Sequence, residues 1–321
     1  MNFIKDFHDG MRTHDIYYCR TKMNAKTKAG KDYINASIQD KTGSIDAKIW
    51  SPMNPGIEEF SQGEYIYVEG DVQSYNGTLQ IIIQRVKKAK DGDYNPDDFI
   101  SSSKKDLNQM TKELDNLIFS IKTPYLKTLL ENVFIKDENF RNEFINHTAA
   151  KNIHHNFMHG LLEHTLSVAH LADAISNIHT DLNRDLMVSA SLCHDIGKVR
   201  EYTKFPTPDY TDEGQLLGHI VIGYEILSKK ISEIKDFPES SKTEFLHIIL
   251  SHHGSLEYGS PKRPALMEAM AVAFVDNIDA KLETMREDLE AAEAIHRKDP
   301  NGFIGYNKFI ESNLRATSPN P

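Results

Sequence analysis

The sequence predicts a multidomain protein in which a small β-barrel is followed by an all-α helical bundle. Short runs of alternating apolar and polar residues extend from about residue 12 to 90, a period typical of β-strands. Helical periodicity begins near Lys105 and continues, with breaks, to about Arg297. Residues 91–104 between these segments are acidic and rich in serine, as expected of a linker. We therefore expect domains at 1–90 and 105–300, with the linker at 91–104 and a C-terminal tail at 301–321.

Five strands are predicted in the N-terminal domain, at residues 15–22, 32–39, 44–50, 65–70 and 78–83. Turn-forming residues separate them, and Tyr75-Asn-Gly77 is a strong hairpin signal. Five short strands are typical of the OB-fold, a small Greek-key barrel whose face binds oligonucleotides. The segment from Asp40 to Trp50 is similar to nucleic-acid-binding OB domains of the anticodon-binding type. The N-terminal domain is thus predicted to be an OB-like β-barrel.

Aromatic and basic residues are interleaved along this predicted barrel. Aromatic rings can stack on bases while cations follow phosphates, a combination that suits single-stranded nucleic acid. Alternatively, some of the aromatic rings fill the barrel core and the basic residues are ordinary surface charges. The candidate nucleic-acid-binding residues are Tyr18, Arg20, Lys22, Tyr33, Lys48, Trp50 and Tyr75.

The pair His194-Asp195 ends an apolar helical run and is followed by Gly197 and Lys198. Imidazole and carboxylate together suit a divalent first-row metal. Further candidate ligands, each in an apolar stretch of its own, are His164, His219, His252, His253 and Asp276. Ligands spread over about 110 residues converge only if their helices form one bundle, with the site between facing helices. The helix of His164 has a buried stripe (Leu161, Leu162, Leu166, Ala169 and Ile175), and residues 264–294 are predicted to form one long helix with Asp276.

The order His164, His194-Asp195, Asp276 resembles the HD superfamily of metal-dependent phosphohydrolases, and this HD-type region covers about residues 145–290. The additional histidines resemble those of its two-metal branches. We expect Asp195 to bridge two ions, because a carboxylate has two oxygens and an imidazole offers one ligating nitrogen at a time. On this hypothesis His164, His194 and Asp276 complete the first site. His219, with His252 or His253, holds the second.

Several residues near these motifs have two interpretations. His219 could cap its helix instead of binding metal, and His252 or His253 could interact with a helix dipole. We expect Lys198 to hold a phosphate oxygen or stabilise developing charge; the alternative is a solvated lysine at a helix end. Other residues with undecided roles are Glu163, which could orient a ligand or transfer a proton, and His155 and His159, which precede the His164 motif.

The two predicted domains together resemble the YhaM-type 3′–5′ exoribonucleases over nearly the full length. This resemblance implies metal-dependent removal of nucleoside 5′-monophosphates from the 3′ end of single-stranded RNA, with single-stranded DNA left open. The resemblance also implies manganese as the ion, and the same ligand types suit Co²⁺, Fe²⁺ or Zn²⁺ as alternatives. Two other functions remain open: an HD-type phosphodiesterase or phosphatase acting on small nucleotides, and a nucleic-acid-binding adaptor with an inert HD domain.

Composition and charge narrow the possible partners and the expected location. The net charge of −10 argues against non-specific coating of nucleic acid. Residues 1–90 are nearly neutral, with 13 Lys/Arg against 11 Asp/Glu, whereas residues 91–321 are acidic, with 24 Lys/Arg against 36 Asp/Glu. No apolar run approaches the roughly 18 residues of a membrane span, and the N-terminus lacks the regions of a signal peptide. Cys19 and Cys193 are too few for a disulfide framework. We expect a cytoplasmic protein with no membrane partner, and a homo-oligomer is left open.

Overall fold

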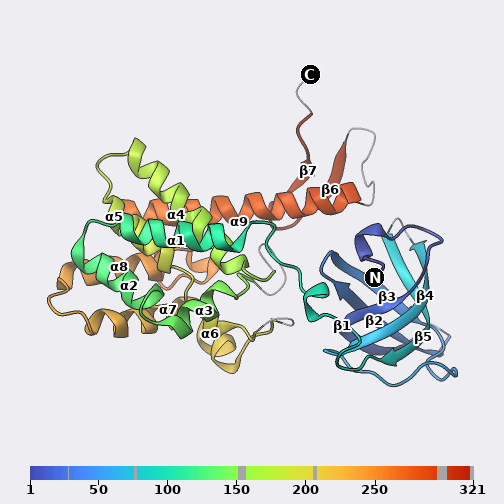
Figure 1. The fold of residues 1–321 in the computed structure, drawn as a ribbon. Helices are drawn as coiled ribbons and strands as arrows, with labels where there is room; N and C mark the ends of the chain where they lie inside the picture. Colours follow the sequence, from blue (N-terminus) through green and yellow to red (C-terminus); the bar gives the residue numbers. More distant parts are fainter. Residues whose placement is uncertain (28, 76–77, 151–156, 205–207, 295–301, 319–321) are drawn as a thin grey trace. The chain divides into compact units, whose positions relative to one another are not determined.

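The computed structural model describes residues 1–321 except 28, 76–77, 151–156, 205–207, 295–301 and 319–321. The chain forms two compact units (Figure 1). The first comprises Met1–Ser101 with Glu290–Ile304, and the second comprises Ser102–Leu289 with Gly305–Pro321. The N-terminal boundary between the units falls inside the predicted linker. Among the described helices, none combines the length and the apolar character needed to cross a bilayer.

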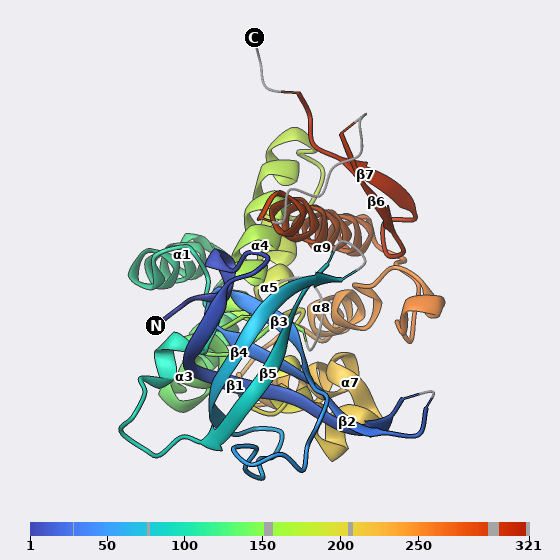
Figure 2. The same ribbon diagram turned by 90° about the vertical axis from the view of Figure 1, so that its right-hand side faces the viewer.

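The first unit is a closed five-stranded barrel, which confirms the predicted OB-like fold. Its strands are β1 (Arg12–Lys26), β2 (Asp32–Asp40), β3 (Gly43–Ile49), β4 (Tyr65–Tyr75) and β5 (Thr78–Lys88). Around the barrel they follow the order β1-β2-β3-β5-β4, and β1 pairs with β4. All neighbours are antiparallel except β3 and β5, whose short parallel pairing closes the ring. Figures 1 and 2 show the strands curving around a common interior.

Alternate residues of the strands fill this interior. In β3 the side chains of Ile45, Ala47 and Ile49 are buried while those between them are more exposed, as the period-two pattern predicts. Gly70 lies at an irregularity in the pairing of β4 with β5, where a Cβ atom would lie 2.5 Å from the Ile82 carbonyl oxygen. The predicted hairpin turn after Tyr75 includes residues 76 and 77, which lie outside the described residues.

Part of the predicted linker packs on the barrel. After η2 (Pro96–Asp98), the ring of Phe99 is buried and lies 5.0 Å from the ring of Tyr65. The Phe99 carbonyl accepts a hydrogen bond from the side chain of Gln39 at 3.1 Å. The prediction of a linker over the whole of 91–104 is therefore wrong for the segment up to Phe99, because two aromatic rings, Tyr94 and Phe99, pack against Tyr65.

The second unit is predominantly helical, as predicted. Its helices are α1 (Leu107–Ser120), α2 (Pro124–Phe134), α3 (Glu138–Ile145), α4 (Gly160–Ile178), α5 (Arg184–Cys193), α6 (Lys198–Glu201), α7 (Asp212–Ser232), α8 (Glu239–Ser251) and α9 (Met267–Ala294). Side chains of Asp106, Asp137, Asn183 and Thr211 cap the N-termini of α1, α3, α5 and α7. One apolar core joins these helices, and it includes the predicted stripe of α4 at Leu161, Leu162, Leu166 and Ala169.

A β-hairpin follows α9, where the sequence indicated only a tail. β6 (Phe303–Asn307) pairs with β7 (Ser312–Arg315), and Leu314 is buried. The side chain of Asn307 donates a hydrogen bond to Asp288 of α9 at 2.6 Å. The prediction of a C-terminal tail at 301–321 is therefore wrong for the two strands of this hairpin. His155, one of the residues with an undecided role, lies outside the described residues.

Candidate metal centre

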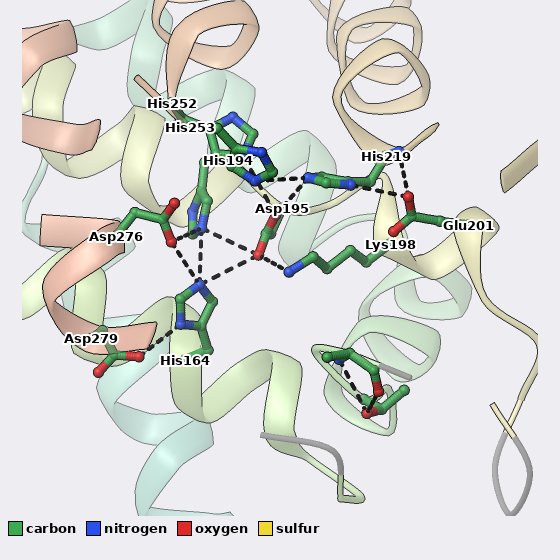
Figure 3. Close-up of polar contacts among 12 residues, drawn as sticks. His164, His194, Asp195, Lys198, Glu201, His219, His252, His253, Asp276 and Asp279 are labelled. Carbon is green, nitrogen blue, oxygen red and sulfur yellow. Dashed lines mark hydrogen bonds and ion pairs between the residues drawn. The ribbon is translucent and has the colours of Figure 1, made fainter. Parts of the chain in front are cut away.

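The predicted metal ligands lie together in the helical unit (Figure 3). They are His164 of α4, His194 and Asp195 directly after α5, His219 of α7, His252 and His253 directly after α8, and Asp276 of α9. Five helices thus contribute to one cluster. The bundle arrangement expected from the spacing of these residues is what allows such distant segments to meet.

Asp195 is at the centre of the cluster, and its two oxygens face different sets of residues. Its Oδ2 lies 3.4 Å from Nε2 of His164 and 3.3 Å from Nε2 of His194. Asp276 faces the same two imidazoles, with its Oδ1 3.2 and 3.6 Å from their Nε2 atoms. We call His164, His194 and Asp276 the first set.

On the other side, Asp195 Oδ1 faces the histidines of α7 and of the segment after α8. It lies 3.5 Å from Nε2 of His219 and 3.6 Å from Nε2 of His252. His253 joins them, with its Nε2 3.3 Å from Nε2 of His219. We call His219, His252 and His253 the second set. Both residues of the His252-His253 pair therefore belong to the cluster, where the sequence left open which one would ligate.

All five imidazoles use Nδ1 to reach a hydrogen-bond acceptor. In three of them the acceptor is a main-chain carbonyl: Ser191 for His194 at 2.7 Å, Ile249 for His252 at 2.7 Å, and Tyr258 for His253 at 2.8 Å. Because a carbonyl only accepts, Nδ1 carries the proton in these rings. In their neutral form, Nε2 then has a free lone pair, which is the arrangement of a metal-ligating histidine.

Two carboxylates outside the predicted ligand set hold the remaining two imidazoles. Asp279 Oδ2 lies 2.7 Å from Nδ1 of His164, and Ser167 donates a hydrogen bond to the other oxygen of Asp279. Glu201 Oε1 accepts from the main-chain N–H of His219 at 2.9 Å and lies 3.1 Å from its Nδ1. Carboxylates in this position fix the orientation of a ligating ring and raise its basicity.

The polar atoms at the centre fit a divalent cation. Asp195 Oδ1 and His252 Nε2 are buried, and neither forms a hydrogen bond with the described residues. The Nε2 atoms of His164 and His194 are 3.2 Å apart. Two lone pairs at this distance repel each other unless a proton or a metal ion lies between them. Nitrogen and carboxylate oxygen are the ligands that first-row divalent metals accept, so the cluster could bind such an ion.

The charges in the cluster are strongly coupled. Burial would raise the pKa of Asp195, but the charges of Lys198 and His194 hold it well below the usual range of an aspartate. Burial also opposes ionisation of Asp276, yet hydrogen bonds from two imidazoles hold its pKa well below the usual range. For His194, burial is outweighed by the charge of Asp195, which raises the pKa to about 9. Both carboxylates are therefore ionised at neutral pH, and cations must balance them.

Close contacts of the main chain position His219 relative to Asp195. Gly218 has φ 72° and ψ 156°, which interrupts α7 immediately before His219. In the turn after Asp195, a Cβ atom on Gly197 would lie 2.0 Å from the His219 carbonyl oxygen and 2.7 Å from the Gly223 nitrogen. Only glycine at 197 allows this approach. The spacing between the two sets of ligands therefore depends on a contact between two backbones.

Lys198 is buried and paired with the central carboxylate. Its Nζ lies 2.6 Å from Asp195 Oδ2, and its side chain is 9% exposed. The alternative of a solvated lysine at a helix end is therefore wrong. Burial would lower the pKa of Lys198, but the charge of Asp195 outweighs this and raises it.

Models of two protein families match the chain: "HD domain" at residues 161–281 and "OB-fold nucleic acid binding domain" at residues 20–89. A curated relative, the 3′-5′ exoribonuclease YhaM of Bacillus subtilis (strain 168), is 35% identical over 290 residues, which cover 88% of this chain and 91% of the relative. The chain belongs to the YhaM family. The relative of the same name in Bacillus velezensis is 32% identical and covers 88% of each chain. Among solved structures, the second OB-fold domain of replication protein A from Methanococcus maripaludis has a TM-score of 0.23 and 18% identity, over 28% of this chain and 96% of that chain.

In this member of the YhaM family, the two orienting carboxylates, Asp279 and Glu201, were not predicted from the sequence. Asp279 could have been found from the sequence, because it lies one helical turn after Asp276 and therefore on the same face of α9. Glu201 has no local signal, because its contact with His219 depends on the packing of α6 against α7. Glu163 had been considered for such a role, but its oxygens contact Ser103 and Lys105. His159 contacts the Ile145 carbonyl at 2.8 Å.

The candidate nucleic-acid-binding residues of the barrel have different environments. Tyr18 is buried and packs 5.1 Å from Tyr65, so the prediction that it stacks on bases is wrong; it lies outside the barrel core, which contains its neighbours Tyr17 and Cys19. Tyr33 and Trp50 stack on each other at 5.1 Å, and Trp50 is 48% exposed. Tyr75, at the end of β4, is also exposed.

The basic candidates of the barrel are partly engaged within it. Lys22 donates a hydrogen bond to the Phe60 carbonyl at 2.6 Å, and Lys48 donates one to the side chain of Asn35. Arg20 is half-buried.

Proposed function

We propose that this protein is a divalent-metal-dependent 3′–5′ exoribonuclease that hydrolyses single-stranded RNA to nucleoside 5′-monophosphates. The observation that carries this proposal is the arrangement around Asp195, whose two oxygens face two separate sets of ligands. The relatives named 3′-5′ exoribonuclease, which this chain matches over about nine-tenths of their length, supply the polarity and the substrate.

Two ions would be held in the cluster. The first set, with Asp195 Oδ2, would hold one ion, and the second set, with Asp195 Oδ1, would hold the other. Manganese is the proposed ion, with Co²⁺, Fe²⁺ or Zn²⁺ as the alternatives that the same ligands accept. Divalent ions there would neutralise phosphoryl oxygens and lower the pKa of an attacking water. The ligand set is complete, which argues against an adaptor with an inert HD domain.

Lys198 would contact the substrate phosphate while it holds Asp195. An ammonium group has three hydrogen-bond donors, and the contact with Asp195 uses one of them. Its burial strengthens this interaction, because a charge in a low-dielectric site acts more strongly than one in water. Asp279 and Glu201 would act as positioning residues that keep the rings of His164 and His219 in orientation.

The barrel would hold the single strand. Stacking of bases on Tyr33, Trp50 and Tyr75 accounts for the aromatic surface, while Arg20, Lys22 and Lys48 would follow the phosphates. Because stacking does not depend on base identity, we expect little sequence preference. RNA as a substrate and two free, buried cysteines agree with a cytoplasmic location.

The test compares 5′-labelled linear RNA, circular RNA of the same sequence, matching DNA and a panel of small nucleotides, each with manganese. We expect the linear RNA to shorten from its 3′ end and to release 5′-mononucleotides, while the circle persists. Cleavage of the circle at the rate of the linear strand would rule out an exonuclease. Turnover of small nucleotides without shortening of RNA would instead establish the small-nucleotide phosphodiesterase.

A further inference from the structure

Helix α9 carries an exposed apolar stripe on the face opposite its metal-site residues. The stripe consists of Met267, Met270, Phe274, Ile278 and Leu282, whose exposed fractions lie between 42 and 62%. At 3.6 residues per turn these positions fall within an arc of about 120°, and Asp276 lies on the other side of the helix. A surface helix normally presents polar residues to water and apolar residues to the core. In α9, the buried face contributes to the core and to the cluster, and the outer face is apolar as well.

A groove borders the N-terminal half of the α9 stripe. Its volume is about 580 Å³, and it runs between the end of α4 and the start of α9. The lining side chains include Ile175, Leu182, Leu266, Met267, Met270 and Phe274. The helix therefore has an apolar hollow at one end of the stripe and, at the other end, the exposed side chains of Ile278 and Leu282, which we call the ridge.

We propose that the α9 stripe is the interface with a second copy of this chain, in which the two α9 helices pack antiparallel about a two-fold axis near Phe274. Such an axis places Leu282 of one copy against Met267 of the other, so the ridge of each copy enters the groove of its neighbour. A hollow and a ridge on one surface are what an interface that pairs with itself requires.

Charges beside the α9 stripe fit the same arrangement. The axis that pairs Met267 with Leu282 also brings Glu268 of one copy to the level of Lys281 of the other. Glu268 Oε1 accepts a hydrogen bond from the Asn183 main-chain N–H at 2.8 Å, so its other oxygen is the one that would meet Lys281. Lys281 is exposed and forms no ion pair with the residues that the structure describes. Opposite charges across an interface fix the register of the two helices. A parallel arrangement would bring like residues together and would lose this pairing.

The area of the α9 stripe is sufficient for a specific dimer. Five side chains that are about half exposed offer roughly 100 Å² each, so two copies would bury roughly 1,000 Å², which reaches the lower limit for a specific interface. The walls of the groove add to this area. A lipid surface is the less suitable occupant, because residues 91–321 carry 36 acidic against 24 basic residues, and helices that bind membrane surfaces are rich in Lys and Arg.

The first test measures the mass of the full-length protein by sedimentation equilibrium. We expect twice the monomer mass of 36.5 kDa for the wild type and the monomer mass for Phe274→Glu, whose charge would be buried at the axis. The matched control is Phe119→Glu on α1, because Phe119 is similarly exposed at 54% but lies outside the α9 stripe. Circular dichroism should be unchanged in both variants. A monomeric wild type, or a dimer that survives in Phe274→Glu, overturns the proposal.

The second test locates the axis directly. Cys19 and Cys193 are buried, so Phe274→Cys adds an exposed thiol to a chain whose described cysteines are inaccessible. A short bis-maleimide should link two copies of Phe274→Cys into a covalent dimer, and it should leave Phe119→Cys monomeric on a denaturing gel. Equal cross-linking of both variants overturns the proposal. So does a wild type that stays monomeric and sediments with lipid vesicles, since the α9 stripe would then serve a membrane.

Discussion

A methyl group added to Gly197 tests whether the backbone contact between α6 and α7 sets the geometry of the metal centre. The added Cβ would lie 2.0 Å from the His219 carbonyl oxygen, whereas ordinary contact begins at 3.4 Å. The two backbones must therefore separate by about 1.4 Å. Overpacking of this kind costs about 1–3 kcal/mol of unfolding free energy, and here the obstacle is main chain, which cannot rotate away. We expect Gly197→Ala to reduce the unfolding free energy by about 3 kcal/mol.

The same displacement moves His219 away from Asp195. A shift of about 1 Å in a catalytic group can reduce a rate roughly 100-fold, so we expect RNA hydrolysis to fall by at least that factor. Calorimetric titration should show weaker binding of manganese, because the second set of ligands is disturbed while the first set is not.

Gly223, on the other side of this contact, provides the matched control. A Cβ atom there would lie 3.5 Å from the Gly197 nitrogen, which is ordinary contact. Since Gly223 lies within α7, alanine should stabilise the helix by up to about 1 kcal/mol. Urea unfolding of both variants measures the difference in their stability. The reasoning is refuted if Gly197→Ala unfolds at the same urea concentration as Gly223→Ala and hydrolyses RNA at the wild-type rate.

Four further substitutions probe the centre, the helical unit and the barrel. Asp195→Asn should abolish hydrolysis and reduce manganese binding while the circular dichroism spectrum stays unchanged. The amide keeps the shape of the side chain but removes the charge between the first and second sets of ligands. Wild-type activity in this variant would exclude a bridging role for Asp195. Asp185 accepts hydrogen bonds from the Thr123 hydroxyl and two main-chain N–H groups, which outweigh its burial and lower its pKa. The ionised Asp185 therefore stabilises the fold above the unfolded-state pKa of about 3.9, and this stabilisation is lost as the pH falls through the lower pKa of the folded state. Asp185→Asn should reduce the unfolding free energy by roughly 1–3 kcal/mol at pH 7, and by almost nothing at a pH below both pKa values. In the barrel, Trp50→Ala should weaken binding of single-stranded RNA by about 1–3 kcal/mol without unfolding, whereas Tyr18→Ala should unfold the barrel. The opposite result would show that Tyr18 stacks on bases and that Trp50 has the structural role.

The residues of the candidate metal centre could be predicted because histidine and aspartate are unusual within apolar helical segments. The orienting carboxylates could not be found in the same way. Glu201 is one of 47 acidic residues, and what distinguishes it is its contact with the backbone of His219, which forms only after α7 breaks at Gly218. Asp279 is the intermediate case, since helical spacing from Asp276 places it on the correct face but does not identify its partner.

The barrel illustrates a second limit of sequence patterns. Alternation predicted its five strands, but not the parallel pairing of β3 with β5 that closes it, because that contact joins segments that no local pattern relates. Tyr18 shows why burial cannot be read from strand parity alone. Tyr17 and Cys19 belong to the barrel core, as alternation predicts, whereas Tyr18 lies between them on the other face of β1 and is buried against Tyr65.

The imidazoles of His194 and His252 have a further consequence for the order of binding. Each follows the last residue of a helix and donates Nδ1–H to a carbonyl of that helix's final turn, so these two candidate ligands are also the C-terminal caps of α5 and α8. The negative ends of two helix dipoles therefore meet at a centre that already contains two ionised carboxylates. This field attracts cations and repels a phosphodiester. We therefore expect productive RNA binding at the centre to follow metal loading, and the affinity for an RNA 3′ end to rise steeply with manganese concentration.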